Sequence, residues 1–161
     1  MITFDSKGYL KPYEIIEIDL QTFQTIFVED FIQSETRQNI FLDYFDFIHD
    51  FKNLICPNVT YWLNGSFVSK KLNPKDLDIV VFIDFEVYEA KKDLIEDKFN
   101  NLRKEKKYPH LDIYTVKVYP LNHLLHFFYL SDKAYWNEWF STTRLDKHRK
   151  QHHKGFIQLQ F

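Results

Sequence analysis

The sequence predicts a single α/β domain that covers residues 1–161. Three observations support this prediction. The chain is long enough for one domain with its own hydrophobic core and short for two. The segment 79–83 is continuously apolar, as expected of a strand that is buried on both faces. Apolar residues within 40–51 and 90–102 recur at steps of three and four, which is typical of amphipathic helices facing a core.

The first third of the chain is expected to hold short extended segments and one long helix. Residues 1–30 are interpreted as extended segments and turns, because glycine and proline interrupt them. Ser34 is a suitable N-cap for the helix that contains 40–51, and Pro57 ends that element.

The rest of the chain is expected to alternate between strands and helices. Strands are predicted where β-branched and aromatic residues gather, and helices where apolar residues recur with the helical period. The predicted elements are a strand over 60–63, a short helical stretch over 67–72, strands over 77–83 and 111–119 on either side of a helix over 86–107, two helical segments over about 121–130 and 132–141, a basic and histidine-rich tail over 144–154, and a last strand over 156–161.

Composition excludes several kinds of site. The formal net charge of -2 gives no overall attraction for nucleic acid, so any site for a polyanion has to be a local patch. Cys56 is the one cysteine, which excludes an intramolecular disulfide and a cysteine-rich zinc site. We see no leader-like N-terminus and no apolar run of the roughly 20 residues that cross a bilayer. We therefore expect a cytoplasmic protein without a membrane partner.

Two carboxylates at the start of the best strand are the strongest indication of chemistry. Side chains two apart on a strand project to the same side, so Asp76 and Asp78 are expected to stand together. Adjacent carboxylates at the edge of a core repel each other unless a cation joins them. Magnesium prefers one or two carboxylates together with phosphate oxygens and water. The pair therefore predicts a site for Mg²⁺ or Mn²⁺; the alternative is that both are only turn and strand-edge residues, because 73–76 is a favourable turn sequence.

A phosphate-binding turn is predicted shortly before this pair. At Gly65 and Ser66, backbone amides can approach a phosphate closely and the serine hydroxyl adds a donor. Ser66 is less favoured as a nucleophile, because no histidine and acid are placed around it. Lys70 and Lys71 follow and are candidates for neutralising a triphosphate; ordinary solvated lysines are the alternative.

A third carboxylate is expected on a later strand. Asp112 lies at the start of the strand predicted over 111–119. If that strand lies near 77–83, Asp112 faces the same metal ions and helps to deprotonate an attacking hydroxyl, the usual division of labour in two-metal sites. The alternative is that Asp112 only caps its strand.

This arrangement resembles the signature of the DNA polymerase beta-like nucleotidyltransferases. The signature consists of Gly-Ser, a spacer, Asp-x-Asp on a strand, and a third acidic residue on a later strand. The matching positions here are Gly65, Ser66, Asp76, Asp78 and Asp112. The wider chain also looks like a compact, poorly characterised bacterial and phage group of such proteins, through its segments 62–68, 135–140 and 154–157.

The resemblance implies a mixed β-sheet flanked by helices, the minimal nucleotidyltransferase fold, with Mg²⁺ at the aspartates. It also implies transfer of a nucleoside monophosphate from an NTP to a hydroxyl acceptor in RNA, a protein or a small molecule. The alternative is a catalytically inactive binding module of the same fold, such as an antitoxin or a phage-defence subunit.

The C-terminal third leaves further interpretations open. The tail over 144–154 carries five arginines and lysines against one acid, which suits either contact with a triphosphate or an RNA backbone, or a solvated surface. His148 and His152 have a spacing that can bind zinc, but no third ligand completes a set. Trp136 and Trp139 are interpreted as core residues, with an aromatic wall for a base as the alternative.

Overall fold

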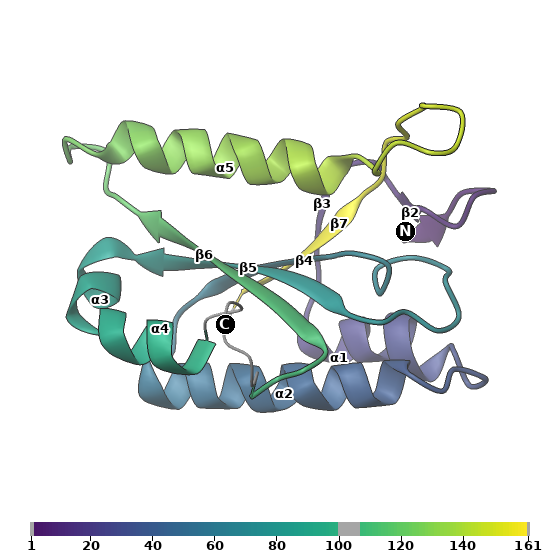
Figure 1. Cartoon of the computed structure of the whole chain (residues 1–161), viewed down its shortest axis with the longest axis horizontal. Helices are drawn as coiled ribbons and strands as arrows, with labels where there is room; N and C mark the ends of the chain where they lie inside the picture. The colour runs from purple at the N-terminus through teal and green to yellow at the C-terminus, as the bar shows by residue number, and fades with distance from the viewer. Residues whose placement is uncertain (1, 100–106, 161) are drawn as a thin grey trace.

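A mixed β-sheet forms the centre of the molecule (Figure 1). The computed structural model describes residues 2–99 and 107–160. The order of the sheet is β3-β7-β4-β5-β6. Its strands are β3 (Ile15–Glu17), β7 (Phe156–Gln160), β4 (Thr60–Asn64), β5 (Leu77–Asp84) and β6 (Leu111–Val118). A separate antiparallel pair is formed by β1 (Thr3–Phe4) and β2 (Leu10–Lys11).

Helices cover both faces of this sheet. Figure 1 shows α2 (Arg37–Leu54) and α1 (Leu20–Gln24) on one side, and α5 (His126–Ser141) along the other. The π-helix η1 (Thr25–Glu29) continues α1, while α3 (Phe85–Ala90) and α4 (Lys92–Phe99) follow β5. None of the described helices combines the length and the apolar character that are needed to cross a membrane.

Strand pairing determines which residues of β4, β5 and β6 lie next to each other. β4 and β5 are antiparallel neighbours, and β5 and β6 are parallel neighbours in direct register, with Leu77 opposite Leu111 and Asp84 opposite Val118. Because the two strands are parallel, the N-terminal ends of β5 and β6 lie next to each other at the same end of the strands. The two strands pair along their whole length.

The alternation along β5 separates two hydrophobic cores. Ile79 and Val81 belong to the larger core, which lies against α2 and includes many aromatic rings. Val80 and Phe82 belong to a smaller core together with Phe140 of α5. Because side chains two apart on a strand share a face, Asp78 lies on the α5 side of the sheet.

Two predicted elements in the first half of the chain differ from the structure. Residues 20–29 are helical instead of extended, because Phe23 and Phe27 recur one turn apart and are fully buried, and the Asp19 carboxylate caps the first turn. Residues 67–72 form turns, since the hydrogen bonds of their carbonyl oxygens go to a side chain of α2.

The remaining differences concern the later helices. One helix spans Ser131, where a boundary was predicted, and residues 121–125 form turns before it. The helix predicted over 86–107 is divided between α3 and α4, and its last part lies outside the described residues. Nothing in the pattern of apolar residues marks the break at Lys91.

Candidate functional site

Asp78 and Asp112 lie side by side on neighbouring strands. They are direct partners in the parallel register of β5 and β6, so their Cα atoms are separated by the spacing of adjacent strands, about 4.8 Å. Both positions share the face of the sheet that α5 covers, because Val80 and Val116, two and four residues further along, pack in the smaller core. The pairing that was predicted conditionally for Asp112 is thus present in the fold.

The ionised form of the Asp78 carboxylate is electrostatically disfavoured. Its pKa is raised from 3.8 to about 6, chiefly by burial and in addition by the charges of Asp76 and Asp112. The cations of Lys154 and Arg144 act in the opposite direction. The three acids predicted from the sequence therefore lie within electrostatic reach of one another, and ionising all three is costly without additional positive charge.

Gly65 allows the turn after β4 to approach this carboxylate. Asn64 is paired with Asp78 across the antiparallel ladder, and the next residue, Gly65, has φ of 85°. A Cβ atom at this position would lie 2.4 Å from Oδ2 of Asp78. Only glycine satisfies both the left-handed backbone and the close contact, so the turn and the carboxylate are built as one unit.

Ser66 and the two lysines occupy the turns that follow. The Ser66 carbonyl oxygen accepts a hydrogen bond of 2.7 Å from the Ser69 hydroxyl, which tightens the turn. Lys70 donates its backbone N–H to Gly8, and its ammonium lies 5.8 Å from the centre of the Phe4 ring. Lys71 is exposed. The structure thus places Lys70 toward the N-terminal strand pair rather than beside Asp78.

Lys154 is a site residue that sequence reasoning included only as part of a basic tail. Its ammonium donates a hydrogen bond of 2.9 Å to Oδ1 of Asn64, and the Asn64 amide donates one of 3.1 Å to the Phe140 carbonyl oxygen. Burial lowers the pKa of Lys154 from 10.5 to about 8, while the charge of Asp78 opposes that shift. The sequence signal that could have identified Lys154 is its position directly before Gly155 and the buried strand β7.

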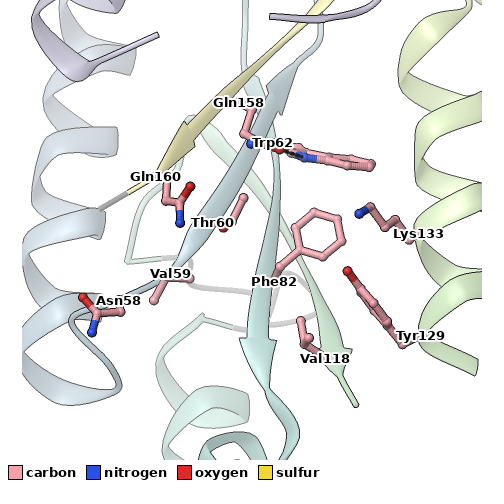
Figure 2. Close-up of a pocket in the computed structure, with 10 residues that line it drawn as sticks. All are labelled: Asn58, Val59, Thr60, Trp62, Phe82, Val118, Tyr129, Lys133, Gln158 and Gln160. Carbon is pink, nitrogen blue, oxygen red and sulfur yellow. Dashed lines mark hydrogen bonds between the residues drawn. The ribbon is translucent and has the colours of Figure 1, made fainter. Parts of the chain in front are cut away.

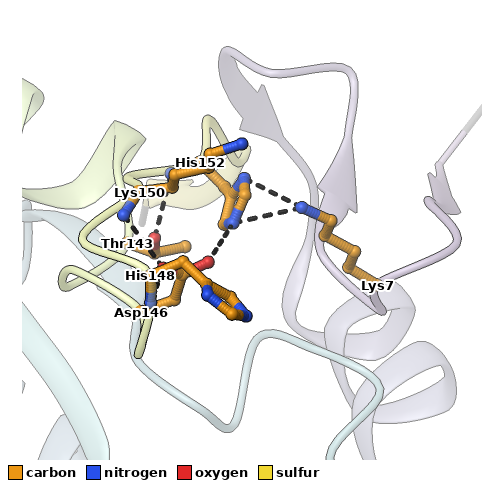
Figure 3. A network of polar contacts seen from close by, with 6 residues as sticks. All are labelled: Lys7, Thr143, Asp146, His148, Lys150 and His152. Carbon is orange, nitrogen blue, oxygen red and sulfur yellow. Dashed lines mark hydrogen bonds and ion pairs between the residues drawn. The ribbon is translucent and has the colours of Figure 1, made fainter.

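The tail over 144–154, here called the basic loop, has a defined structure (Figure 3). Asp146 Oδ1 accepts hydrogen bonds from the backbone N–H groups of His148 and Lys150, at 2.8 and 2.9 Å. The other carboxylate oxygen of Asp146 lies 3.1 Å from Nε2 of His152, and the same imidazole contacts the Lys7 ammonium. These contacts use the one acid of the loop internally. Its lysine and arginine side chains other than Lys154 are exposed.

Arg37 holds the segment that follows the Gly65 turn through hydrogen bonds. Its buried guanidinium donates hydrogen bonds of 2.6 to 2.7 Å to four backbone carbonyl oxygens, which belong to Phe27, Phe67, Ser69 and Lys71. It also lies 3.7 Å from the centre of the Phe31 ring. Three of the four carbonyls lie in 67–71, directly after the Gly65 turn. Arg37 therefore fixes the course of the segment that leads into Asp76.

A cavity of about 330 Å³ lies on the same face of the sheet but at the other end of the strands. Figure 2 shows Phe82 and Trp62 of the sheet directed toward Tyr129 and Lys133 of α5. Phe82 is four residues beyond Asp78 on β5, a distance of about 13 Å along the strand. The packed rings of the smaller core lie between, so this cavity is separate from the acidic site.

The residues at the acidic site suit a hard cation in their chemistry. No group of three or more His, Cys, Asp or Glu side chains in residues 2–99 and 107–160 is already arranged as a set of metal ligands. Asp78 and Asp112 are nevertheless register partners, and burial together with the charges of Asp76 and Asp112 raises the pKa of Asp78. Oxygen donors of this kind are those that Mg²⁺ and Mn²⁺ prefer. The donor set therefore fits such an ion.

Comparison with known proteins places the chain in a family without assigning an activity. Neither the curated proteins nor the solved structures contain a match. A family model described as "Family of unknown function (DUF6932)" matches residues 2–160, which is nearly the whole chain. The chain therefore belongs to the DUF6932 family.

Proposed function

We propose that this protein is a nucleotidyltransferase, which transfers a nucleoside monophosphate from an NTP to a hydroxyl acceptor. The observation that carries the proposal is the convergence of Asp76, Asp78 and Asp112 beside the Gly65 turn, with the pKa of Asp78 raised to about 6. Neighbouring carboxylates beside a glycine turn are suited to this reaction. The resemblance of the motif to polymerase beta-like enzymes supports the same assignment.

The residues of the chain have separate tasks in this reaction. Gly65 and Ser66 hold the triphosphate through backbone N–H groups and the serine hydroxyl. Arg144 and Lys154, whose charges act on Asp78, contribute positive charge for the phosphate oxygens. Lys70 and Lys71 remain candidates for a more distant phosphate contact. Arg37 and Asn64 are positioning residues, because they hold the segment 67–71 and the Lys154 ammonium in place.

Asp112 is assigned the proton transfer. The acceptor hydroxyl gives its proton to the Asp112 carboxylate, and its oxygen forms a bond to the α-phosphorus. The bond from the α-phosphorus to the bridging oxygen breaks, so that pyrophosphate leaves. Asp76, Asp78 and Asp112 would hold Mg²⁺ or Mn²⁺, which supplies positive charge for the triphosphate when bound. Positioning and electrostatics thus account for most of the rate enhancement.

One observation favours a second candidate, a non-catalytic binding module of the same fold. The Lys154 ammonium already offsets the charge of Asp78, so part of the electrostatic strain is relieved without a metal ion. A non-catalytic module, such as an antitoxin or a phage-defence subunit, would need this compensation of charge and no metal ion. The two candidates differ in metal-dependent NTP binding, which the module would lack.

A labelling assay tests the proposal. The purified protein is incubated with each α-³²P-labelled NTP, Mg²⁺ or Mn²⁺, and a pool of RNA and cell lysate, beside the double variant Asp76→Asn/Asp78→Asn. Asp84→Asn is the matched control, since it removes a carboxylate from the same strand and retains the cap of α3. We expect transfer by the wild type and by Asp84→Asn, and a loss of at least about 10³-fold in the double variant.

The outcomes separate the two candidates. Labelled product that depends on Asp76 and Asp78 supports the transferase and reveals the acceptor class. Absence of transfer, combined with calorimetry that detects no metal-dependent NTP binding, overturns the transferase and favours the binding module. Transfer that persists in the double variant overturns the assignment of the site.

A further inference from the structure

A row of aromatic rings, three of them exposed and one partly buried, lies beside the acidic site. We call Tyr114, Tyr135, Trp136 and Trp139 the aromatic wall. The Tyr114 ring packs on Trp136 with 4.6 Å between their centres. Tyr135 and Trp139 are nearly parallel, at an interplanar angle of 14° and 6.2 Å. Tyr135 is 58% exposed and Trp139 53% exposed, although tryptophan in a helix of this kind was expected to be part of the core.

The wall adjoins the aspartates directly. Tyr114 follows Asp112 by two residues on β6 and therefore lies on the same face of the sheet. Burial raises the pKa of the Tyr114 hydroxyl, and the charges of Asp112 and Asp78 raise it further, which places the ring within their electrostatic reach. An elongated ligand that lies along the wall therefore has one end at Asp112.

The basic loop borders the other side of the wall. The loop starts where α5 ends and returns to its starting point, since Lys154 donates its backbone N–H to Ser141 and Thr143 donates to His152. Trp139 is thus two residues from the point where the loop closes. Four of its basic side chains are exposed, namely Arg144, Lys147, Arg149 and Lys150. Its one acid, Asp146, is occupied by the loop's own backbone and by His152.

Flat aromatic rings beside a concentration of positive charge suit a particular kind of ligand. Single-stranded nucleic acid offers unpaired base faces that stack on tyrosine and tryptophan, and phosphates that pair with lysine and arginine. A duplex keeps its base faces stacked internally and cannot use the wall in this way. The net charge of the chain is -2, so the attraction has to come from this local concentration of charge.

We propose that the acceptor is the end of a single-stranded nucleic acid, whose bases stack on Tyr135 and Trp139 and whose phosphates lie on the basic loop. The terminal hydroxyl then lies at Asp112. This inference rests on the proposed nucleotidyl transfer and specifies its substrate class. The binding surface is nevertheless independent of the metal site, so that it can be tested without turnover.

Fluorescence anisotropy with labelled 12-nucleotide oligomers of mixed sequence tests the proposal. The probes are single-stranded RNA, single-stranded DNA and the matching duplexes, each in a series of salt concentrations and without NTP. The first variant, Tyr135→Ala/Trp139→Ala, removes two stacking rings. The second, Lys147→Ser/Arg149→Ser/Lys150→Ser, removes three cations. The matched control Leu124→Ala/Phe127→Ala removes two exposed apolar side chains at the other end of the same helical region.

We expect single strands to bind at least about 10-fold more tightly than duplexes, and the ring variant to lose about 10-fold or more in affinity. The loop variant should bind more weakly and show a salt dependence that is shallower by about two charges. The Leu124/Phe127 control should remain within about two-fold of the wild type. Matched RNA and DNA probes differ in the 2′-hydroxyl and in the methyl group of thymine, and their affinities identify which of the two is preferred.

Three results would overturn the proposal. The first is the absence of single-strand binding at low salt, and the second is an equal loss in the ring variant and in the control. The third is self-association of the wild type that the ring variant abolishes, because the wall would then be a protein interface. Metal-dependent NTP binding, measured separately by calorimetry, shows whether the nucleotidyltransferase site itself survives any of these outcomes.

Discussion

Gly65 and Asp78 show how one contact between two residues defines the candidate site. The turn at Gly65 needs a positive φ, and the absence of a side chain lets the Asp78 carboxylate lie against it. The carboxylate in turn is shielded from water, which raises its pKa. The acid and the turn therefore depend on each other.

The first prediction concerns this contact. Gly65→Ala should weaken metal-dependent NTP binding at least about 10-fold, because its Cβ would displace the Asp78 carboxylate. Gly8→Ala is a matched control: Gly8 also has a positive φ, of 83°, and a Cβ there meets only Lys70. Both variants should lose stability through backbone strain, and calorimetry with NTP and Mg²⁺ distinguishes them. Equal losses of NTP affinity would contradict the prediction.

The second prediction follows from the raised pKa of Asp78. The ionised carboxylate is disfavoured in the folded state, so its contribution to stability is fully present below pH 3.8 and is lost as the pH rises through about 6. A shift from 3.8 to about 6 corresponds to about 3 kcal/mol at pH 8. Asp78→Asn should therefore be more stable than the wild type at pH 8 in EDTA.

Urea unfolding at several pH values measures this effect. The advantage of Asp78→Asn should decrease as the pH falls through about 6, where the folded wild-type carboxyl takes up a proton, and should vanish below pH 3.8, where the carboxyl is neutral in both states. Asp84→Asn, on the exposed end of the same strand, should show no comparable gain. An advantage that does not change with pH would mean that electrostatic strain is not its cause.

At the scale of elements, Arg37 connects the long helix to the loop that carries the site. It is the first residue of α2, and its four hydrogen bonds hold carbonyl oxygens from η1 and from 67–71. These carbonyls explain why 67–72 forms turns and not the short helix expected from the sequence. Burial lowers the pKa of the guanidinium to about 10, which leaves it charged at neutral pH.

The third prediction is that Arg37→Met destabilises the protein by at least about 3 kcal/mol, because buried carbonyl oxygens lose their donors. Arg37→Lys should recover only part of this loss, since an ammonium cannot reproduce the planar fork of five N–H donors. Urea unfolding measures the loss. Amide hydrogen exchange should locate the greatest increase in 67–71 at low denaturant, and a uniform increase over α2 would argue against a specific role in the loop.

At the scale of the whole molecule, the candidate site is assembled from segments that lie far apart in the sequence. Its residues come from the β4–β5 turn, from the starts of β5 and β6, and from the basic loop beyond α5 (Figure 1). The aromatic wall, which is formed by three residues of α5 and by Tyr114 of β6, lies next to this junction. Ligand binding at such a junction joins elements that unfolding separates, so it should stabilise the entire fold.

The fourth prediction is a thermal shift. Mg²⁺ with NTP at about 100 times its dissociation constant should raise the unfolding free energy by about 2.7 kcal/mol, or the midpoint by about 5 to 10 °C. Asp76→Asn/Asp78→Asn should lose this shift, and Asp84→Asn should retain it. Differential scanning fluorimetry measures the midpoints. A shift of equal size in all three proteins would show that the ligand binds elsewhere.

Local patterns were sufficient to predict the elements that carry the aspartates. The apolar run after Asp78 predicted β5, the residues after Leu111 predicted β6, and the recurring apolar positions predicted α2. The fold class, an α+β domain with a mixed sheet, agrees with the structure. These predictions succeed because burial imposes a period of two or 3.6 on the sequence itself. The α1 helix was missed, since its five residues are too few to show a period clearly.

The sequence by itself thus predicted β4 to β7 and α2, and it identified the three acids and the Gly-Ser turn as candidates. Only the tertiary structure decided that Asp112 is the register partner of Asp78, that Lys154 and not Lys70 offsets the charge of Asp78, and that Trp139 faces solvent. The physical reason is that strand register and charge proximity depend on contacts between residues that lie far apart in the chain. The distance from Asp78 to Lys154 is set by the packing of β7 beside β4, which no local pattern encodes.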